Sequence, residues 1–81
     1  SFEARVDGQI VDVTAKELAV LKLLVEHQGQ VLSRSQILDH VWASHEDPPF
    51  DRVVDVYIKQ LRKKLLLDCI VTVKNVGYKL E

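Results

Sequence analysis

Residues 50–65 have the clearest chemical character in the chain, because their cations gather on one side of an amphipathic pattern. At about 100° per residue, one side is apolar and carries Val54, Tyr57, Ile58, Leu61 and Leu65. The opposite side is polar and carries Arg52, Lys59, Gln60, Arg62 and Lys63, with Val56 among them. Residues 52–64 hold five cations but one acid, Asp55. This pattern predicts a helix that packs by its apolar side and turns the other side toward an anion.

The distribution of charge supports an anionic partner, although the net charge does not. The 81-residue chain carries a formal charge of −1 at pH 7. Residues 1–51 hold four Lys or Arg and nine Asp or Glu, whereas residues 52–80 hold seven Lys or Arg and two Asp or Glu. Such asymmetry between halves points to a polyanion such as nucleic acid. A charge gradient without function on a solvated surface remains the alternative at this point.

Composition places the chain among small globular domains. Hydrophobic residues make up 47% and charged residues 28%, and the length suits one domain. No apolar run approaches the roughly 20 residues of a membrane span, and no signal-peptide pattern occurs. Cys69 is the sole cysteine, so an intrachain disulfide is excluded, which fits a reducing cytoplasm. Because the chain starts at Ser1 and lacks Met, we expect a fragment of a longer protein.

The sequence offers no catalytic or metal-binding pattern. His27, His40 and His45 lack the spacing of metal ligands, and Cys69 has no second cysteine with which to hold zinc. No nucleophile–base–acid set and no glycine-rich phosphate loop occurs. We therefore expect no metal, no cofactor and no enzymatic activity.

The chain is expected to begin with a β hairpin and a helix. Residues 1–13 form the hairpin around Asp7-Gly8, because both central residues of such a turn need positive φ. Thr14 and Glu17 make a capping box that opens a helix over 14–28. Its buried side is expected to consist of Leu18, Leu21, Leu24 and Val25.

The second helix is predicted over 33–43, after a short extended piece at Val31-Leu32. It opens on a second capping box, from Ser33 to Gln36. Its inward residues are expected to be Ile37, Leu38, Val41 and Trp42. An acidic, proline-containing loop over 44–49 then leads to the basic helix, which is predicted over 50–66.

After residue 68 the apolar period changes to two, which predicts a second hairpin over 69–81. Lys74-Asn75 lies in its turn, because Asn tolerates the left-handed conformation. Three successive helices of which the last is basic outline a helix-turn-helix, and a hairpin after such a helix is a wing. The predicted fold is therefore α+β, a winged helix-turn-helix with three helices, an N-terminal hairpin and a C-terminal wing.

Motifs from about residue 9 to the C-terminus add a family resemblance. They are Val13-Thr14 with Glu17 and Leu21, Gly29-x-Val31-x-Ser33-Arg34, Leu38 with Val41-Trp42, Arg52-x-Val54-Asp55-Val56-x-Ile58-x-x-Leu61-Arg62-x-Lys64-Leu65, and Ile70-x-Thr72-Val73-Lys74-x-x-Gly77-Tyr78. In this order and spacing, the chain resembles the C-terminal winged-helix DNA-binding domain of OmpR/PhoB-type response regulators. That family domain usually opens with a four-stranded sheet, so the single hairpin is expected to belong to a truncated sheet.

The resemblance implies sequence-specific binding of double-stranded DNA. Base contacts fall to four residues of the basic helix, namely Val56, Lys59, Gln60 and Lys63. Gln60 is the first candidate for discrimination, because its amide can bond bidentately to adenine, whereas the Arg often found there favours guanine. Val56 matches a position that meets a thymine methyl. The alternatives are a solvated Gln60, a tolerated exposed Val56, and phosphate contacts for the two lysines.

Contacts to the DNA backbone are also implied. They fall to Arg34, Trp42, Arg52, Arg62 and Thr72. Three of these residues have a structural alternative: an ion pair for Arg62, an acid of this domain for Arg34, and core packing for Trp42.

Lys74 belongs to the wing and replaces an Arg that commonly enters the minor groove. Lys keeps the charge but not the preference of Arg for narrow grooves. Asp55 is expected to be structural, because it lies near the positive end of the helix dipole and four residues before Lys59. Two residues depart from the family pattern: Val53 stands where small polar residues are common and so loses one possible phosphate hydrogen bond, and Asn75 replaces the usual Gly in the wing turn.

The resemblance further implies partners beyond this domain. The longer protein would carry an N-terminal receiver domain, act in the cytoplasm without a membrane segment, and bind direct repeats of DNA as a head-to-tail homodimer. The loop at 44–49 would face RNA polymerase. The alternative is a winged-helix protein-interaction module that does not bind DNA.

Overall fold

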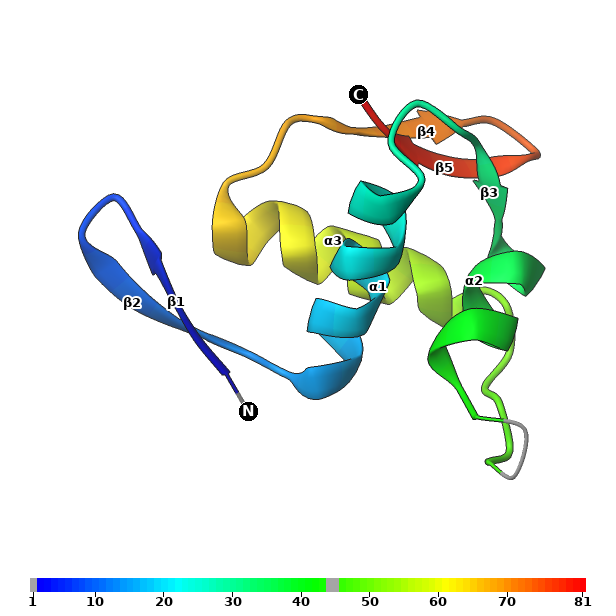
Figure 1. The fold of residues 1–81 in the computed structure, drawn as a ribbon, viewed down its shortest axis with the longest axis horizontal. Coiled ribbons are helices and arrows are strands. Elements are labelled where there is room, and N and C mark those ends of the chain that lie inside the picture. The colour runs from blue at the N-terminus through cyan, green and yellow to red at the C-terminus, as the bar shows by residue number, and fades with distance from the viewer. Residues whose placement is uncertain (1, 44–45) are drawn as a thin grey trace.

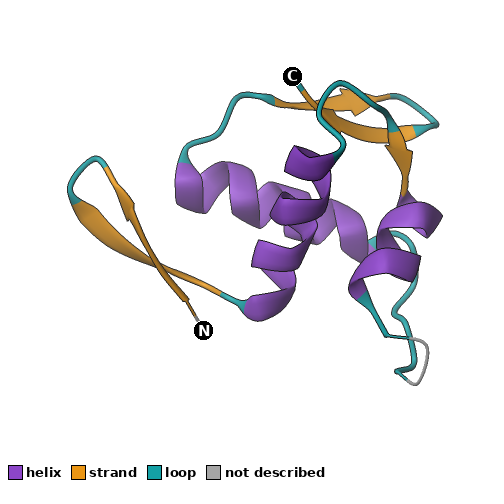
Figure 2. Cartoon of the chain, viewed as in Figure 1, coloured by secondary structure: helices purple, strands orange, loops and turns teal. Residues whose placement is uncertain are grey.

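The computed structural model describes residues 2–43 and 46–81 and shows an α+β domain (Figure 1). Its elements are β1 (Phe2–Val6), β2 (Gln9–Val13), α1 (Ala15–Glu26), β3 (Leu32–Ser33), α2 (Arg34–Val41), α3 (Val53–Leu65), β4 (Ile70–Val73) and β5 (Gly77–Leu80). Figure 2 shows the strands in two separate groups, on either side of the helices. None of the helices in the described ranges is long and apolar enough to cross a bilayer.

Both predicted capping boxes are present and begin the first two helices. Thr14 Oγ1 accepts from the N–H of Glu17 at 3.2 Å, and Glu17 Oε1 accepts from the N–H of Thr14 at 2.9 Å. Ser33 and Gln36 make the same reciprocal pair at 3.0 and 2.8 Å. These bonds satisfy backbone donors that a first helical turn leaves without partners. The starts of α1 and α2 are therefore set by residues adjacent in sequence.

The third helix begins later than predicted, at Val53 rather than at residue 50. Arg52 precedes it without a side-chain cap. In place of a cap, residues 50–52 form a tight turn whose carbonyls accept from N–H groups three residues later at 2.9 to 3.1 Å. Leu66, in the left-handed conformation with φ 53°, ends the helix.

The core lies where the three helices meet the C-terminal sheet. Its largest fully buried side chains are Leu24, Ile37, Ile58, Leu61, Val20 and Val54. The predicted buried side of α1 is confirmed for Leu24 and for Leu21, which packs against the core, but it is wrong for Leu18 and Val25, which are 37% and 51% exposed. Val20 and Leu23 are buried instead, together with Glu17. The inward side of α1 thus contains an acid, which apolar periodicity alone assigns to solvent.

The N-terminal hairpin forms as predicted, with β1 antiparallel to β2 and positive φ at Asp7 and Gly8. The wing turn also has its predicted left-handed residue, Asn75, at φ 64°. The wing itself is larger than a two-stranded hairpin. β3 pairs with β5, so the sheet has three strands in the order β3-β5-β4. The extended piece predicted before the second helix is therefore part of the wing sheet, and the wing is fastened to the start of α2.

Candidate nucleic-acid interface

The four candidate base-contact residues share one stripe of α3. Val56, Lys59, Gln60 and Lys63 are spaced i, i+3, i+4 and i+7, which places them on one face of a helix. Val56 is 53% exposed, the two lysines are exposed, and Gln60 is half-buried. The opposite stripe holds the buried residues Val54, Ile58 and Leu61. The packing of α3 thus leaves the predicted reading face uncovered.

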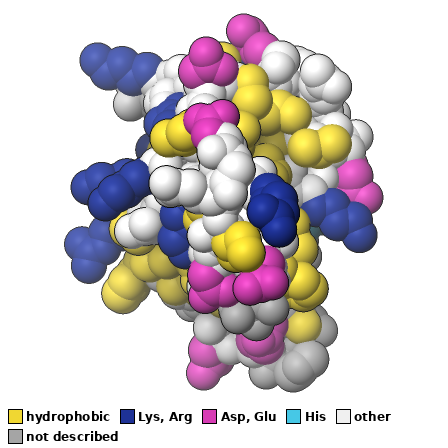
Figure 3. All heavy atoms as spheres, turned by 90° about the vertical axis from the view of Figure 1, so that its left-hand side faces the viewer, with side chains coloured by type: hydrophobic (Ala, Val, Ile, Leu, Met, Phe, Trp, Pro, Cys, Tyr) yellow, Lys and Arg dark blue, Asp and Glu magenta, His cyan; other side chains and the backbone are white. Residues whose placement is uncertain are grey.

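Lys and Arg side chains project together from one edge of the molecule in Figure 3. In Figure 1 this edge is the far side of the molecule, where α3 passes behind α1. A projecting cluster of cations is the electrostatic footprint expected of a surface that meets a phosphate backbone.

The ion pairs divide the cations of the domain into two groups. Four cations are neutralised internally, in the pairs Lys16–Glu46, Arg34–Asp55, Lys64–Glu17 and Lys79–Glu81, at 2.7 to 3.0 Å. Among the described residues, no ion pair holds Arg52, Lys59, Lys63 or Lys74. These four flank or lie on α3 and occupy the wing turn. Arg5, Lys22 and Arg62 also lie outside these pairs, so among the described residues five of the seven cations without an ion pair lie on or beside α3 or in the wing turn, where the sequence places DNA contacts.

Arg62 donates from Nη2 to the carbonyl of Ile70 at 2.7 Å and to Thr72 Oγ1 at 3.0 Å. The competing role expected for Arg62 was an ion pair, yet its observed partners are neutral oxygen atoms of the wing. Thr72, a second candidate backbone contact, is thereby engaged inside the protein. An arginine has five N–H donors, so these two bonds leave others for a phosphate.

Asp55 pairs with Arg34, and the expected pairing with Lys59 is wrong. Arg34 Nε lies 2.7 Å from Asp55 Oδ1, and the hydroxyl of Tyr78 donates to the same oxygen. The bidentate-capable guanidinium and the fixed phenol are better partners than the flexible ammonium of Lys59 in the next turn. Burial opposes ionisation of Asp55, but the bonds from Tyr78 and Arg34 hold the pKa of the carboxyl below its usual value. Arg34 thus meets an acid of this domain, the alternative left open for it.

Burial raises the pKa of the Tyr78 hydroxyl, and its bond to Asp55 raises it further. The guanidiniums of Arg34 and Arg62 lie 5.6 and 5.9 Å from the centre of the Tyr78 ring. Tyr78 therefore remains a neutral donor at physiological pH, with two cations beside its ring.

Trp42 has neighbours on two sides. Its ring meets Tyr57 edge to face at 5.6 Å between centroids, and Lys16 Nζ lies 5.1 Å from its centroid. In the described ranges, the indole N–H makes no hydrogen bond, and no buried side-chain nitrogen or oxygen lacks a partner. The indole nitrogen is therefore accessible. Trp42 packs partly against the core and also retains a donor for a phosphate.

The acidic loop predicted at 44–49 is described only in part, because residues 44 and 45 lie outside the described residues. Glu46 accepts from Lys16 Nζ at 3.0 Å and from the N–H of Ala43 at 2.8 Å. Lys16 also donates to the carbonyl of Val41 at 3.2 Å. Glu46 is thus held against α1 and the end of α2.

Two features of the surface escaped the sequence analysis. Phe50 is 77% exposed, and the guanidinium of Arg52 lies 5.6 Å from its ring centre. Lys64, counted among the cations of the basic helix, instead donates to the buried Glu17 at 2.8 Å. The first feature has no signal in the pattern of apolar residues. The second had none either, because the capping box gives Glu17 a backbone partner but does not indicate that its carboxylate is buried against α3.

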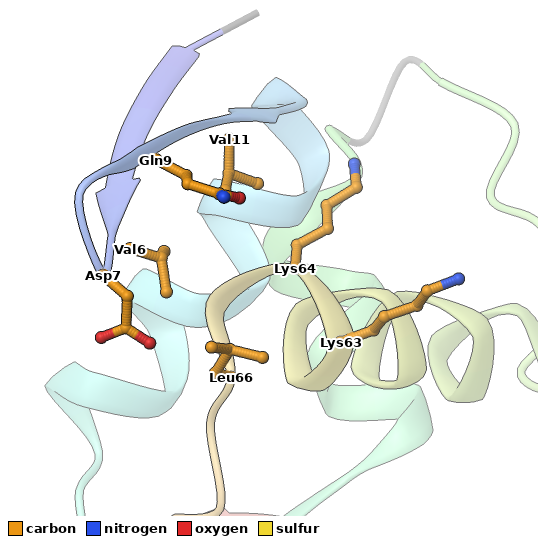
Figure 4. Close-up of a pocket in the computed structure, with 7 residues that line it drawn as sticks. All are labelled: Val6, Asp7, Gln9, Val11, Lys63, Lys64 and Leu66. Carbon is orange, nitrogen blue, oxygen red and sulfur yellow. The ribbon is translucent and has the colours of Figure 1, made fainter.

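A cleft of about 330 Å³ separates the N-terminal hairpin from the end of α3. Its lining includes Val6, Val11 and Leu66, and the ammonium groups of Lys63 and Lys64 point away from it (Figure 4). The cleft therefore does not present convergent cations to an anion. Within the described ranges, no group of three or more His, Cys, Asp or Glu could hold a metal ion.

Comparison with known proteins identifies the origin of this arrangement. Residues 8–80 match the family described as "Transcriptional regulatory protein, C terminal". The chain belongs to this family. The predicted membership in the OmpR/PhoB-type C-terminal domains and the winged-helix fold are confirmed. The family is one of DNA-binding domains that regulate transcription, not of enzymes.

Individual relatives of the domain agree with the family match. The chain is 59% identical over 81 residues to the response regulator RR06 of Streptococcus pneumoniae. The alignment covers 100% of this chain and 37% of RR06. The DNA-binding domain of Bacillus subtilis CssR has a TM-score of 0.81 at 35% identity, with 93% of this chain and 84% of CssR covered. DrrB of Thermotoga maritima, an OmpR/PhoB homolog, has a TM-score of 0.79 at 33% identity, with 98% of this chain and 37% of DrrB covered. The chain spans about 37% of the length of the curated relatives it matches.

Proposed function

We propose that this domain binds duplex DNA sequence-specifically, with α3 in the major groove. The exposed stripe of Val56, Lys59, Gln60 and Lys63 is the observation that carries the proposal, because its two lysines have no described ion pair. A helix fits the major groove of B-DNA, where base edges differ in donors, acceptors and methyl groups. Gln60 supplies an amide for adenine, and Val56 an apolar contact for thymine.

Backbone contacts would position the helix. Arg52, at the start of α3, and Trp42, with its accessible indole N–H, are the candidates least engaged in hydrogen bonds within the described chain. Arg34, Arg62 and Thr72 would reach phosphates while keeping their bonds inside the domain. Lys74, in the wing turn, would approach the adjacent minor groove. Such contacts fix register and supply affinity through release of counterions.

Replacement of Arg52 by alanine is expected to lower the slope of log affinity against log salt by about one unit, because one phosphate contact is lost. Titrations of a fluorescent duplex at several salt concentrations would measure the slope. Arg5→Ala is the matched control, because Arg5 is equally exposed but lies on the N-terminal hairpin. Equal slopes for wild type and Arg52→Ala would remove Arg52 from the interface. A wild-type affinity that does not respond to salt would contradict the proposed function itself.

Replacement of Gln60 by alanine is expected to cost roughly 1–3 kcal/mol of discrimination at one base position, while non-specific affinity changes little. Selection of bound sites from random duplexes would measure this, since the variant should lose the preference at a single position. Arg52→Ala serves for comparison, because loss of a phosphate contact weakens binding to all sequences alike. Identical motifs for wild type and Gln60→Ala would show that Gln60 does not read a base.

We further propose that the domain works within a longer response regulator. Its relatives at full length are response regulators, so a phosphorylatable receiver domain N-terminal to this chain would control it in the cytoplasm. The protein would bind direct repeats as a head-to-tail dimer, with half-sites about 10 to 10.5 base pairs apart. The 44–49 loop, whose Glu46 is held by Lys16, would face RNA polymerase. Changing the spacing between selected half-sites by about 5 base pairs should abolish cooperative binding if the repeat arrangement is correct.

A further inference from the structure

The wing is anchored at its base and exposed at its turn. Ile70 and Leu80 are buried in the core at 3% and 8% exposure, whereas residues 74–76 are all exposed. Across the described ranges, two side-chain bonds to helix α3 lie two residues from the turn, the bond from Arg62 to Thr72 on β4 and the bond from Tyr78 on β5 to Asp55. Thr72 precedes Lys74 by two residues, or about 6.6 Å of strand. The β4 side of the turn is therefore held to α3 by Arg62, while the β5 side is held by Tyr78 and by the pairing of Gly77 with Ser33.

Arg62 connects the wing to the reading face because it lies on α3 between Lys59 and Lys63. Its Nη2 donates two hydrogen bonds to β4, one to the Ile70 carbonyl and one to the Thr72 hydroxyl. Its guanidinium also lies 5.9 Å from the Tyr78 ring on β5. One side chain of the recognition helix thus contacts both strands of the wing hairpin.

Tyr78 also connects β5 to the start of α3, and through it to α2. Tyr78 donates to Asp55, and Asp55 accepts from Arg34 at 2.7 Å. Arg34, Asp55, Arg62, Thr72 and Tyr78 form a connected set, which we name the wing bracket. The wing bracket joins the three elements that must meet DNA in a fixed relative position.

We propose that Arg62 is a positioning residue, which holds the wing against α3 so that Lys74 reaches DNA in register with the base-reading stripe. This inference rests on the proposed function, since it assigns a cause to the wing contact. This role differs from a direct phosphate contact by Arg62, because here Arg62 affects DNA binding through the position of Lys74. Charge alone is insufficient: a Lys at this position keeps the cation but lacks the planar guanidinium, which lies beside the Tyr78 ring while its Nη2 donates to both wing acceptors.

A double-mutant cycle separates the two roles. In the wild-type chain, Lys74→Ala should weaken binding to a selected duplex by about 5-fold, as the loss of one backbone or groove contact does. In an Arg62→Lys background, the same Lys74→Ala change should weaken binding by less than about 2-fold, because the wing no longer delivers Lys74. In the control cycle of Lys59→Ala with Lys74→Ala, the two fold-changes should multiply. Multiplying fold-changes for Arg62→Lys with Lys74→Ala would overturn the proposal.

Hydrogen exchange of the free chain tests the wing bracket without DNA. Arg62→Lys should raise the exchange rates of ladder amides in β4 and β5 by about 10-fold, while the amides of Ile58 and Leu61 in α3 keep theirs. Unchanged exchange in the wing overturns the proposal, and so does a rise that includes α3, because the change would then be global. If Lys74→Ala has no effect on wild-type binding, the wing contact of the proposed function fails. Exchange confined to the wing would in that case still support the wing bracket.

Discussion

Replacement of Gly77 by alanine is expected to destabilise the domain by about 3 kcal/mol or more, and to abolish DNA binding through the wing. A Cβ at this position would lie 1.9 Å from the carbonyl oxygen of Leu32, and 2.8 Å from Leu32 C and Ser33 Cα. All three are backbone atoms, so no side-chain rotation can relieve the overlap. The variant must separate β3 from β5, which also disturbs Ser33, the cap of α2.

Urea unfolding followed by circular dichroism would measure this loss, together with titration of duplex DNA. Gly29→Ala is the matched control, because nothing lies within 4 Å of a Cβ there and its φ is +85°. The control should cost only about 1 kcal/mol, the strain of a left-handed alanine. A Gly77→Ala domain as stable as the Gly29→Ala domain would show that the close approach of β3 and β5 does not constrain the wing.

Features fixed by neighbours in sequence were predictable. The two capping boxes, the Asp7-Gly8 turn and the left-handed Asn75 each depend on residues within three positions of one another. The basic helix was predictable for a related reason, since its apolar stripe repeats over more than three turns. Its reading face followed once the packed face was known.

Features that depend on distant residues were not predictable. Glu17 is buried and bonded to Lys64, 47 residues later in the chain, while Leu18 and Val25 face solvent. β3 is two residues long, and only its pairing with β5, over 40 residues away, makes it a strand. Patterns of single segments contain neither contact.

The same distinction between local features and contacts of distant residues applies to the candidate site. Residue types and helical spacing correctly located an exposed cationic stripe, because solvent exposure follows from which face packs. They could not distinguish a cation available to DNA from one already bonded inside the protein. Arg62 lies on the same polar side as Lys59, and Arg34 and Lys64 are cations nearby in the sequence pattern of the helices, yet all three have partners on other elements.

Replacement of Glu17 by alanine is expected to destabilise the domain by about 3 kcal/mol. Glu17 is 4% exposed, and its Oε1 accepts from Lys64 and from the N–H of Thr14. Removal of the carboxylate leaves the ammonium of Lys64 uncompensated and opens a gap beneath α1. Because Lys64 belongs to α3, the loss should weaken the contact between α1 and the recognition helix. Thermal and urea unfolding would measure it, with the exposed Glu26→Ala on the same helix as the control, expected to change stability by less than about 0.5 kcal/mol.

The dependence of stability on pH gives an independent test of the same ion pair. Burial opposes ionisation of Glu17, but the bonds from Lys64 and Thr14 outweigh it and lower the pKa of the carboxyl. A lowered pKa in the folded state contributes stability above the unfolded pKa, about 4.3, and this contribution is lost as pH falls through the folded pKa. Glu17→Gln should therefore differ most from wild type near pH 7 and least below about pH 3. Asp55 also has a lowered pKa, so both proteins should still lose stability in acid. A difference between wild type and Glu17→Gln that stays constant from pH 7 to pH 3 would show that Glu17 contributes through packing rather than through its charge.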